Sequence, residues 1–239
     1  MTTLDVYNGG VGGNTSTQIA TRMLAATDKY GDITIIWAGR TNYWSQSQVL
    51  ADVASMVSVL SSPKQFLVMS VLNGNLPGET KGSSNYNAIV SMNNALAAAY
   101  PNNYLDIRSY LVSQYNQENP ADVIDHSNDT VPYSLRAVDL SGTLSDSIGS
   151  GDLQIQTGAA LYSGVIATVD SEMILVGNVT GTGPYTAAVT RGYASTTAAP
   201  HDAGSSLVGV DAVHLNGRGY TLVAQQVATS LTNSGYIAP

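Results

Sequence analysis

Residues 32–37 read DITIIW, and this stretch decides the fold class. It is β-branched and nearly all apolar, without the alternation expected of a strand that faces water on one side. A strand that is apolar on both sides is typical of a parallel sheet covered by helices. Residues 66–72 (FLVMSVL) have the same character. We therefore expect two buried parallel strands.

Segments with helical spacing of apolar residues alternate with these strands. They are residues 16–26, 45–60 and 85–100, the last of which Pro101 ends. Short apolar runs at residues 4–7 and 104–107 complete a β-α-β-α-β-α-β order. This order predicts right-handed crossovers and an α/β fold with a doubly wound parallel sheet.

The pattern changes after residue 136. Short alternating runs separated by Gly, Ser and Thr replace the helical spacing, at residues 153–156, 165–169, 173–176 and 187–190. Helical spacing returns at residues 219–231. The 239-residue chain is thus predicted to form one discontinuous α/β domain from residues 1–136 and 211–239. A small all-β module of residues 137–210 interrupts that domain.

The composition excludes several classes of partner. The net charge is −8, with nine basic and seventeen acidic side chains, which argues against nucleic acid and against an anionic membrane surface. Cys is absent, so disulfides and thiolate sites are excluded. No His, Asp and Glu grouping has the spacing of a metal site, and we expect neither a metal nor a cofactor.

Three short segments resemble the SGNH (GDSL-type) hydrolases. They are residues 10–16 (GVGGNTS), 38–42 (AGRTN) and 211–216 (DAVHLN). The resemblance implies a flavodoxin-like three-layer α/β/α domain and ester hydrolysis by a Ser nucleophile. It also implies that His214 is the base, that Asp211 orients it, and that Gly13 gives a backbone N–H to the oxyanion.

The chain departs from this family in two blocks. No Gly-Asp-Ser block is found, so no nucleophilic Ser is assigned, and only twelve residues precede Gly13. Thr41 stands where the family has its oxyanion Asn, and Asn42 where it has an Asp. Either Thr41 donates to the oxyanion, or a shift of register lets Asn42 do so.

The missing block would also remove the first strand, which is central in a flavodoxin-like sheet. Its loss would leave facing rows of unpaired N–H and C=O groups. A strand from a preceding polypeptide, a neighbouring subunit or another part of this chain would fill the gap, or the sheet would be rearranged. We hypothesise donation from another chain in a larger assembly.

The β module resembles one found in tailed-phage structural proteins. The resemblance rests on residues 169–176 (VDSEMILV), 188–193 (AVTRGY) and 198–201 (AAPH). Residues 70–75 and 102–106 likewise resemble SGNH-type domains of phage fibres and tailspikes.

Aromatic and charged residues suggest further sites, each with a structural alternative. Tyr43 and Trp44 could stack on a sugar, or they could pack as ordinary half-buried aromatic residues. Arg40 could bind a carboxylate of the substrate, or it could form a structural salt bridge. His126, in a stretch (residues 122–129) expected to be a polar loop, and His201 are interpreted as structural.

We therefore expect a virion structural protein of a tailed phage, a fibre, tail or decoration component on the particle surface. Its partners would be other virion chains or further copies of itself, together with host-surface polysaccharide. The alternative is an active carbohydrate esterase, a serine O-deacetylase whose Ser comes from outside this chain. A free lectin-like module is the third hypothesis. By itself the chain is expected to be inactive.

Overall fold

The computed structural model describes residues 5–161 and 163–238. It is a mixed α/β protein with a three-stranded parallel sheet and a separate six-stranded antiparallel sheet. The chain divides into two compact units. Unit 1 comprises the chain up to Val71, Ala88–Ile107 and the chain from Gln226, and unit 2 comprises Leu72–Asn87 and Arg108–Gln225. The predicted division at residues 136 and 211 stays a prediction.

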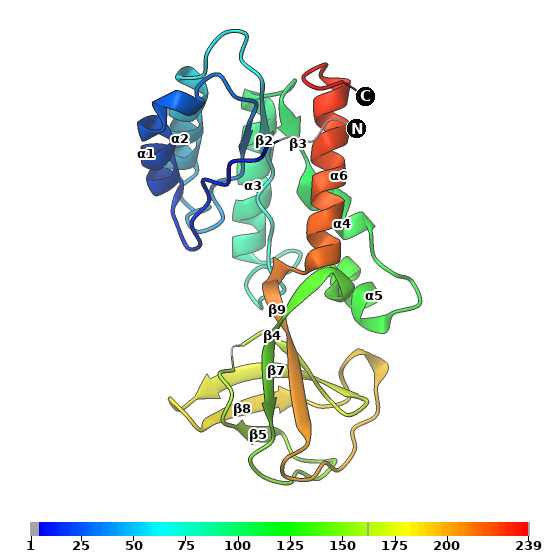
Figure 1. The fold of residues 1–239 in the computed structure, drawn as a ribbon. Coiled ribbons are helices and arrows are strands. Elements are labelled where there is room, and N and C mark those ends of the chain that lie inside the picture. Colours follow the sequence, from blue (N-terminus) through cyan, green and yellow to red (C-terminus); the bar gives the residue numbers. More distant parts are fainter. Residues whose placement is uncertain (1–4, 162, 239) are drawn as a thin grey trace. The chain divides into compact units, whose positions relative to one another are not determined.

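Unit 1 contains the parallel sheet, in the order β1-β2-β3 (Figure 1). Its strands are β1 (Thr34–Ile36), β2 (Phe66–Met69) and β3 (Tyr104–Leu105). Its helical segments are α1 (Ser16–Ala25), the short η1 (Thr27–Lys29), α2 (Gln46–Ser58) and most of α3 (Ser84–Ala99). The three expected helices and the strands expected near residues 34, 66 and 104 are confirmed in type and order.

The first helix begins at a capping residue. Thr15 caps α1 by accepting from the Gln18 N–H, while the Gln18 side chain accepts from the Thr15 N–H, a capping box. The core of unit 1 includes fully buried apolar side chains from two helices and the central strand: Val49, Val53 and Met56 of α2, Ile89, Met92 and Leu96 of α3, and Val68 of β2.

The strand β1, predicted from residues 32–37 to be buried on both faces, is only partly buried. Among the described residues, β1 pairs with β2 alone and is an edge strand. Ile36 is 3% exposed, but Ile35 and Trp37 on the other face are 39% and 37% exposed. The strand expected at residues 4–7 is not formed by residues 5–7, and Leu4 lies outside the described residues. The apolar strand β1 therefore has one buried face and one partly exposed face.

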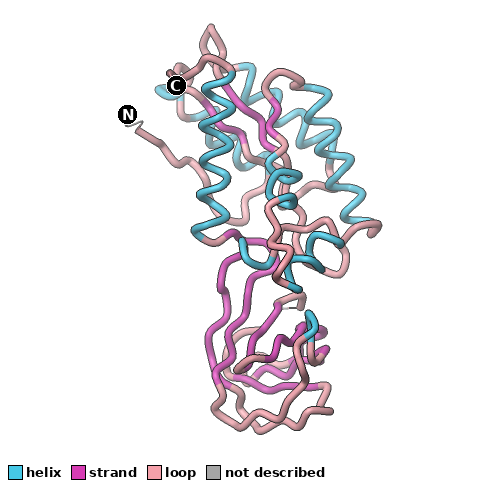
Figure 2. Tube along the Cα trace, turned by 90° about the vertical axis from the view of Figure 1, so that its right-hand side faces the viewer, coloured by secondary structure: helices cyan, strands magenta, loops and turns pink. Residues whose placement is uncertain are grey.

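Unit 2 contains the antiparallel sheet, in the order β4-β9-β6-β7-β8-β5. Its strands are β4 (Arg136–Thr143), β5 (Gln154–Thr157), β6 (Ile166–Val169), β7 (Glu172–Thr180), β8 (Tyr185–Thr190) and β9 (Ser206–Leu215). Figure 2 draws the strands in magenta. A bridge between Leu144 and Thr157 links the ends of the two edge strands, so the sheet curls around its own apolar core. Gly209 is required inside it, because a Cβ there would lie 2.7 Å from the Val165 side chain.

Helices also lie where the sequence pattern predicted none. They are α4 (Ile107–Ser113), α5 (Pro120–Ser127) and the short η2 (Tyr133–Leu135) and η3 (Tyr193–Ser195), while the expected last helix is α6 (Gly217–Asn233). The polar-loop interpretation of residues 122–129 is wrong for most of that stretch. Asn119 caps α5 by accepting from the Ala121 N–H, and Pro120 follows at the first helical position.

A buried cluster of charged side chains connects β7 of the antiparallel sheet with the segment that follows β8. The Arg191 guanidinium donates to both carboxylate oxygens of Glu172, at 2.7 and 2.8 Å, and their side chains are 4% and 1% exposed. His201 Nε2 lies 2.9 Å from Glu172 Oε2, and its Nδ1 lies 2.8 Å from Asp170. The backbone N–H groups of Gly192 and Ala199 also donate to Glu172. Every oxygen of this carboxylate is therefore paired.

Replacing this carboxylate should strongly destabilise unit 2. We expect Glu172→Gln to lower the free energy of unfolding by about 3 kcal/mol near neutral pH, because Arg191 is then buried without a counter-charge. The exposed Glu118→Gln is the matched control. Urea denaturation measures both, and equal stability of the two variants would contradict the expectation.

The same carboxylate should make stability depend on pH. Burial would raise the pKa of Glu172, but hydrogen bonds from Arg191, Ala199, Gly192 and His201 outweigh burial and hold the pKa at about 2, below the usual 4.5. A lowered pKa contributes stability above the unfolded value and loses it as pH falls through the folded one. The gap between wild type and Glu172→Gln should therefore shrink from pH 4.5 to about 2; a constant gap would be inconsistent.

Candidate functional site

An Asp–His pair stands at the end of β9. Asp211 Oδ2 lies 2.6 Å from His214 Nδ1, and Asp211 Oδ1 accepts the backbone N–H groups of His214, at 2.8 Å, and of Val213. Asp211 is 7% exposed, whereas the His214 side chain is 73% exposed. Because the carboxylate accepts from Nδ1–H, the lone pair of the ring lies on Nε2. The nitrogen Nε2 of this exposed ring can therefore accept a proton.

The carboxylate of this pair is held ionised. Burial would raise the pKa of Asp211, but the hydrogen bonds from the His214 ring and from the two backbone N–H groups outweigh it, and the pKa lies below its usual value. An ionised Asp211 can orient the imidazole and stabilise its protonated form. This is the geometry that a general base in acyl transfer requires.

A buried arginine fixes the strand beneath the pair. Arg136 Nη1 donates to the backbone carbonyl of Asp211 at 2.8 Å, and Nη2 forms an ion pair with Asp125 Oδ2 at 2.8 Å. Both side chains are at most 1% exposed. The sequence analysis did not single out Arg136. The sequence feature that could have identified Arg136 is an isolated basic residue directly before a segment of alternating apolar residues.

The residues assigned to the oxyanion lie in unit 1, in loops beside α1. Gly13 has φ of +77°, and the Thr41 hydroxyl donates to the Asn14 carbonyl at 2.6 Å. Asn42 is 7% exposed; its Oδ1 accepts the Ser16 N–H at 3.0 Å, and its Nδ2 donates to Ser16 Oγ at 2.9 Å. The three residues do gather around one loop, and their oxyanion role stays a prediction.

A second carboxylate, which sequence reasoning missed, organises that loop. Asp52 Oδ2 accepts from Ser16 Oγ at 2.6 Å and from Thr17 Oγ1 at 2.8 Å. Its Oδ1 accepts from Gln48 Nε2 at 2.9 Å. Asp52 lies on the buried face of α2, between Val49 and Met56. An acidic residue at a helical position expected to be apolar is the sequence feature that could have identified it. Ser16 is fully buried, and its hydroxyl serves this network.

The predicted substrate-binding residues lie beside one another. The Arg40 guanidinium is 5.7 Å from the centre of the Tyr43 ring, and the Tyr43 and Trp44 rings meet edge to face at 5.0 Å. Tyr43 is 6% exposed and Trp44 is 67% exposed. Of the two rings, Trp44 can stack on a ligand, while Tyr43 packs in the core.

The two sets of residues belong to different units. Asp211 and His214 lie in unit 2, and the loop residues 13 and 40–44 lie in unit 1. Each set is assembled within its own unit. Within the described residues, no hydroxyl group bonds to His214 Nε2.

The other two histidines have structural surroundings. His126 stacks on Tyr115 with ring centres 3.8 Å apart, and its Nδ1 lies 3.2 Å from the Val112 carbonyl. His201 belongs to the Glu172 cluster. In the part of the chain that the structure describes, no group of three potential ligand side chains could hold a metal ion, and no helix could span a membrane.

Comparisons with family models, with curated proteins and with solved structures found no match for this chain.

The Asp–His pair yields a direct electrostatic prediction. In His214→Ala, Asp211 stays buried but loses the ring hydrogen bond, so we expect the pKa of Asp211 to rise. NMR titration of the Asp211 carboxyl carbon measures it, and His126→Ala, on another element, is the control. An unchanged Asp211 titration in His214→Ala would mean that the backbone N–H groups alone set it.

Proposed function

We propose that this chain is a structural protein of a tailed-phage virion, built on an SGNH-hydrolase-like α/β domain that is completed by a strand from another chain. The observation that carries the proposal is the open edge of β1. The residues of this strand have the composition of a strand buried on both sides, and the structure leaves one edge and one face of it uncovered.

The geometry of β1 defines what could bind there. The Thr34 N–H donates to the Gln65 carbonyl, so Thr34 and Ile36 face β2. In a parallel ladder alternate residues bond to opposite neighbours, so the N–H and C=O of Ile35 face the open edge. A strand added there would gain main-chain hydrogen bonds and cover Ile35 and Trp37, the mode known as β-augmentation.

Exposed apolar side chains support an interface in the same part of the chain. Seven of the eleven large apolar residues that are exposed in the described structure lie between residues 6 and 44. They include Val6 at 85%, Tyr7 at 66% and Trp44 at 67% exposure. Among them, Ile35 and Trp37 lie on the uncovered face of β1 and next to it, where an added strand would contact them. In the simplest form of the proposal, the added strand comes from a second copy of this chain.

Two further observations support the family and the setting. The helices α1, α2 and α3 around a parallel sheet and the Asp211–His214 pair are compatible with an SGNH-like domain. Because β1 pairs directly with β2, the gap expected between these two strands is absent and the sheet order is rearranged from the flavodoxin-like one, so an added strand would bind at the outer edge of β1. The phage-like segments of the β module supply the Glu172, Arg191 and His201 cluster, so the residues behind that resemblance have a structural reason to occur together.

The test of assembly uses a charge at the open edge. We expect the wild-type chain to sediment as an oligomer, and Ile35→Lys to sediment as a folded monomer, because an ammonium group at the strand edge opposes pairing. Leu153→Lys, at a residue 67% exposed in unit 2, is the matched control and should remain oligomeric. A folded wild-type monomer at high concentration would overturn the proposal.

The second candidate is a carbohydrate esterase, which the formed Asp211–His214 pair favours. In that reaction His214 Nε2 would take the proton of an added Ser hydroxyl as its oxygen attacks the acyl carbonyl. The proton would then pass to the departing sugar oxygen, and water would release the acid.

Hydrolysis of p-nitrophenyl acetate separates the two candidates. We expect the purified chain to show no turnover above that of His214→Ala, since no described hydroxyl group bonds to His214. Turnover that His214→Ala abolishes would instead support the esterase.

A further inference from the structure

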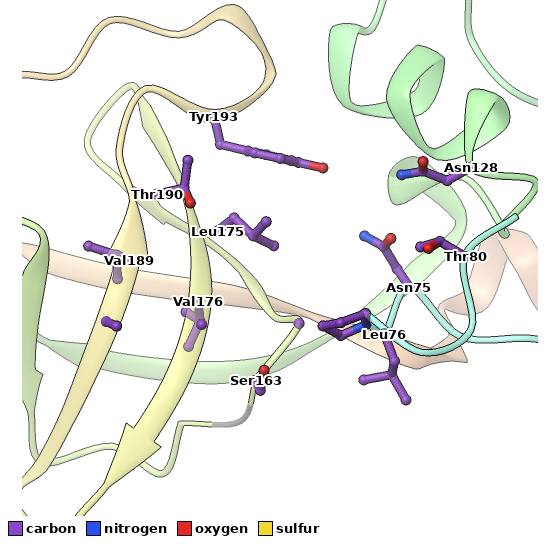
Figure 3. A pocket seen from close by; sticks show the side chains of 14 residues that line it. Asn75, Leu76, Thr80, Asn128, Ser163, Leu175, Val176, Val189, Thr190 and Tyr193 are labelled. Carbon is purple, nitrogen blue, oxygen red and sulfur yellow. The ribbon is translucent and has the colours of Figure 1, made fainter. Parts of the chain in front are cut away.

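Unit 2 contains a pocket with a volume of about 370 Å³ (Figure 3). One side is formed by residues of β7 and β8, with Leu175 as its large apolar side chain. The other side is polar and includes Asn75, Thr80 and Asn128, and Tyr193 of η3 adds an aromatic ring. This size lies within the range of about 300–1,000 Å³ that is typical of small-molecule sites.

The lining carries no formal charge near neutral pH. None of its fourteen residues is an Asp, Glu, Lys, Arg or His. Burial, and next the charge of Asp125, raise the pKa of Tyr193, so its hydroxyl remains a neutral donor. A ligand of this pocket gains nothing from carrying a charge.

The polar side chains of the pocket are unused within the described residues. The side chains of Asn75, Asn128 and Thr80 and the hydroxyl of Tyr193 make no hydrogen bond there. Asn75 is 7% exposed, and the exposed part includes its carboxamide atoms, so a ligand in the pocket can reach them. Figure 3 shows the Asn75 and Asn128 carboxamides and the Tyr193 hydroxyl directed into the same space.

The polar wall is held rigidly from behind. Asn73 Nδ2 donates to the Glu79 and Asp129 carbonyls, and Glu79 Oε2 accepts the Gly74 N–H at 2.6 Å. The Asn75 N–H donates to the Ala212 carbonyl at 2.7 Å. The backbone on both sides of Asn75 is therefore fixed while its side chain is left free, which is the arrangement of a preorganised binding group.

Strained backbone adjoins two of the lining residues. Ala194 and Ser195, directly after Tyr193, have φ of +54° and +64°, and Asp129, directly after Asn128, has φ of +54°. Non-glycine residues in the left-handed region are uncommon and cluster at ligand sites. Three of the four such residues in the described structure follow a lining residue in this way.

We propose that this pocket binds a neutral saccharide unit. Carboxamides pair a donor with an acceptor and so match the hydroxyl groups of a sugar, each of which does both. The apolar C–H face of the ring would lie on Leu175, whose side chain is on the face of the sheet opposite to the core residues Val176 and Val189. A lipid would leave the Asn75 and Asn128 carboxamides unpaired, and an anionic sugar would meet no cation.

The test is titration of the ¹⁵N-labelled chain with methyl glucoside, methyl galactoside and methyl N-acetylglucosaminide, followed by NMR. We expect at least one of them to shift the side-chain amide signals of Asn75 and Asn128, more than glucuronate or glucosamine does. Tyr193→Phe, which removes only a hydroxyl, should weaken binding about fivefold. Tyr185→Phe, on β8 outside the pocket, is the control and should bind as the wild type.

Three outcomes would overturn the saccharide site. They are the absence of shifts at Asn75 and Asn128 with every neutral sugar, equal binding by Tyr193→Phe and the wild type, and larger shifts with a neutral peptide such as Gly-Ser-Gly. The site would supply the contact with host-surface polysaccharide that we expect of a virion structural protein, and in that sense it rests on the proposed function, but it does not involve β1. Loss of sugar binding with intact assembly would therefore remove the site alone, and a monomer that binds sugar would remove the assembly alone.

Discussion

Backbone groups at the open edge of β1 impose the constraint on which this account of the protein depends. Main-chain N–H and C=O groups must be paired or hydrated, and apolar side chains beside them favour pairing. In β1 the inner edge is satisfied by β2, while the outer edge lies next to the half-exposed Ile35 and Trp37. A strand with this composition is more stable as part of a larger sheet, which is why we propose assembly through this edge.

In unit 2, the edge strands of the sheet are linked to each other within the unit. Its edge strands β4 and β5 are linked through Leu144 and Thr157, and buried charges pair with one another instead of with solvent. The Arg136 guanidinium carries this order to the end of β9, where it holds the Asp211 carbonyl. His214 is thereby presented to solvent on a fixed strand, and the polar wall of the pocket is fixed by comparable backbone bonds.

Periodicity predicted the long elements well, because burial of one helix face or of a strand imposes it directly. It missed α4 and α5, which are short, although the Asn119 cap and Pro120 were a readable start signal. The last strand, β9, runs from Ser206 to Leu215 and so includes the predicted boundary at residue 211, which stays a prediction. Asp211 and His214 were predicted from the resemblance of residues 211–216 to the SGNH hydrolases. Asp52, Arg136 and Asn75 were not predicted, since their importance arises from partners distant in sequence.

Amide hydrogen exchange of two neighbouring residues tests the central claim most directly. Ile36 bonds to β2 in any state of the protein, whereas the Ile35 N–H faces the open edge. Residue-resolved exchange of the assembled wild-type chain should therefore show slow exchange at both amides, and Ile35 alone should become fast on dilution to the monomer. Fast exchange at Ile35 in the assembled protein, with Ile36 protected, would show that no strand is added and would contradict the account.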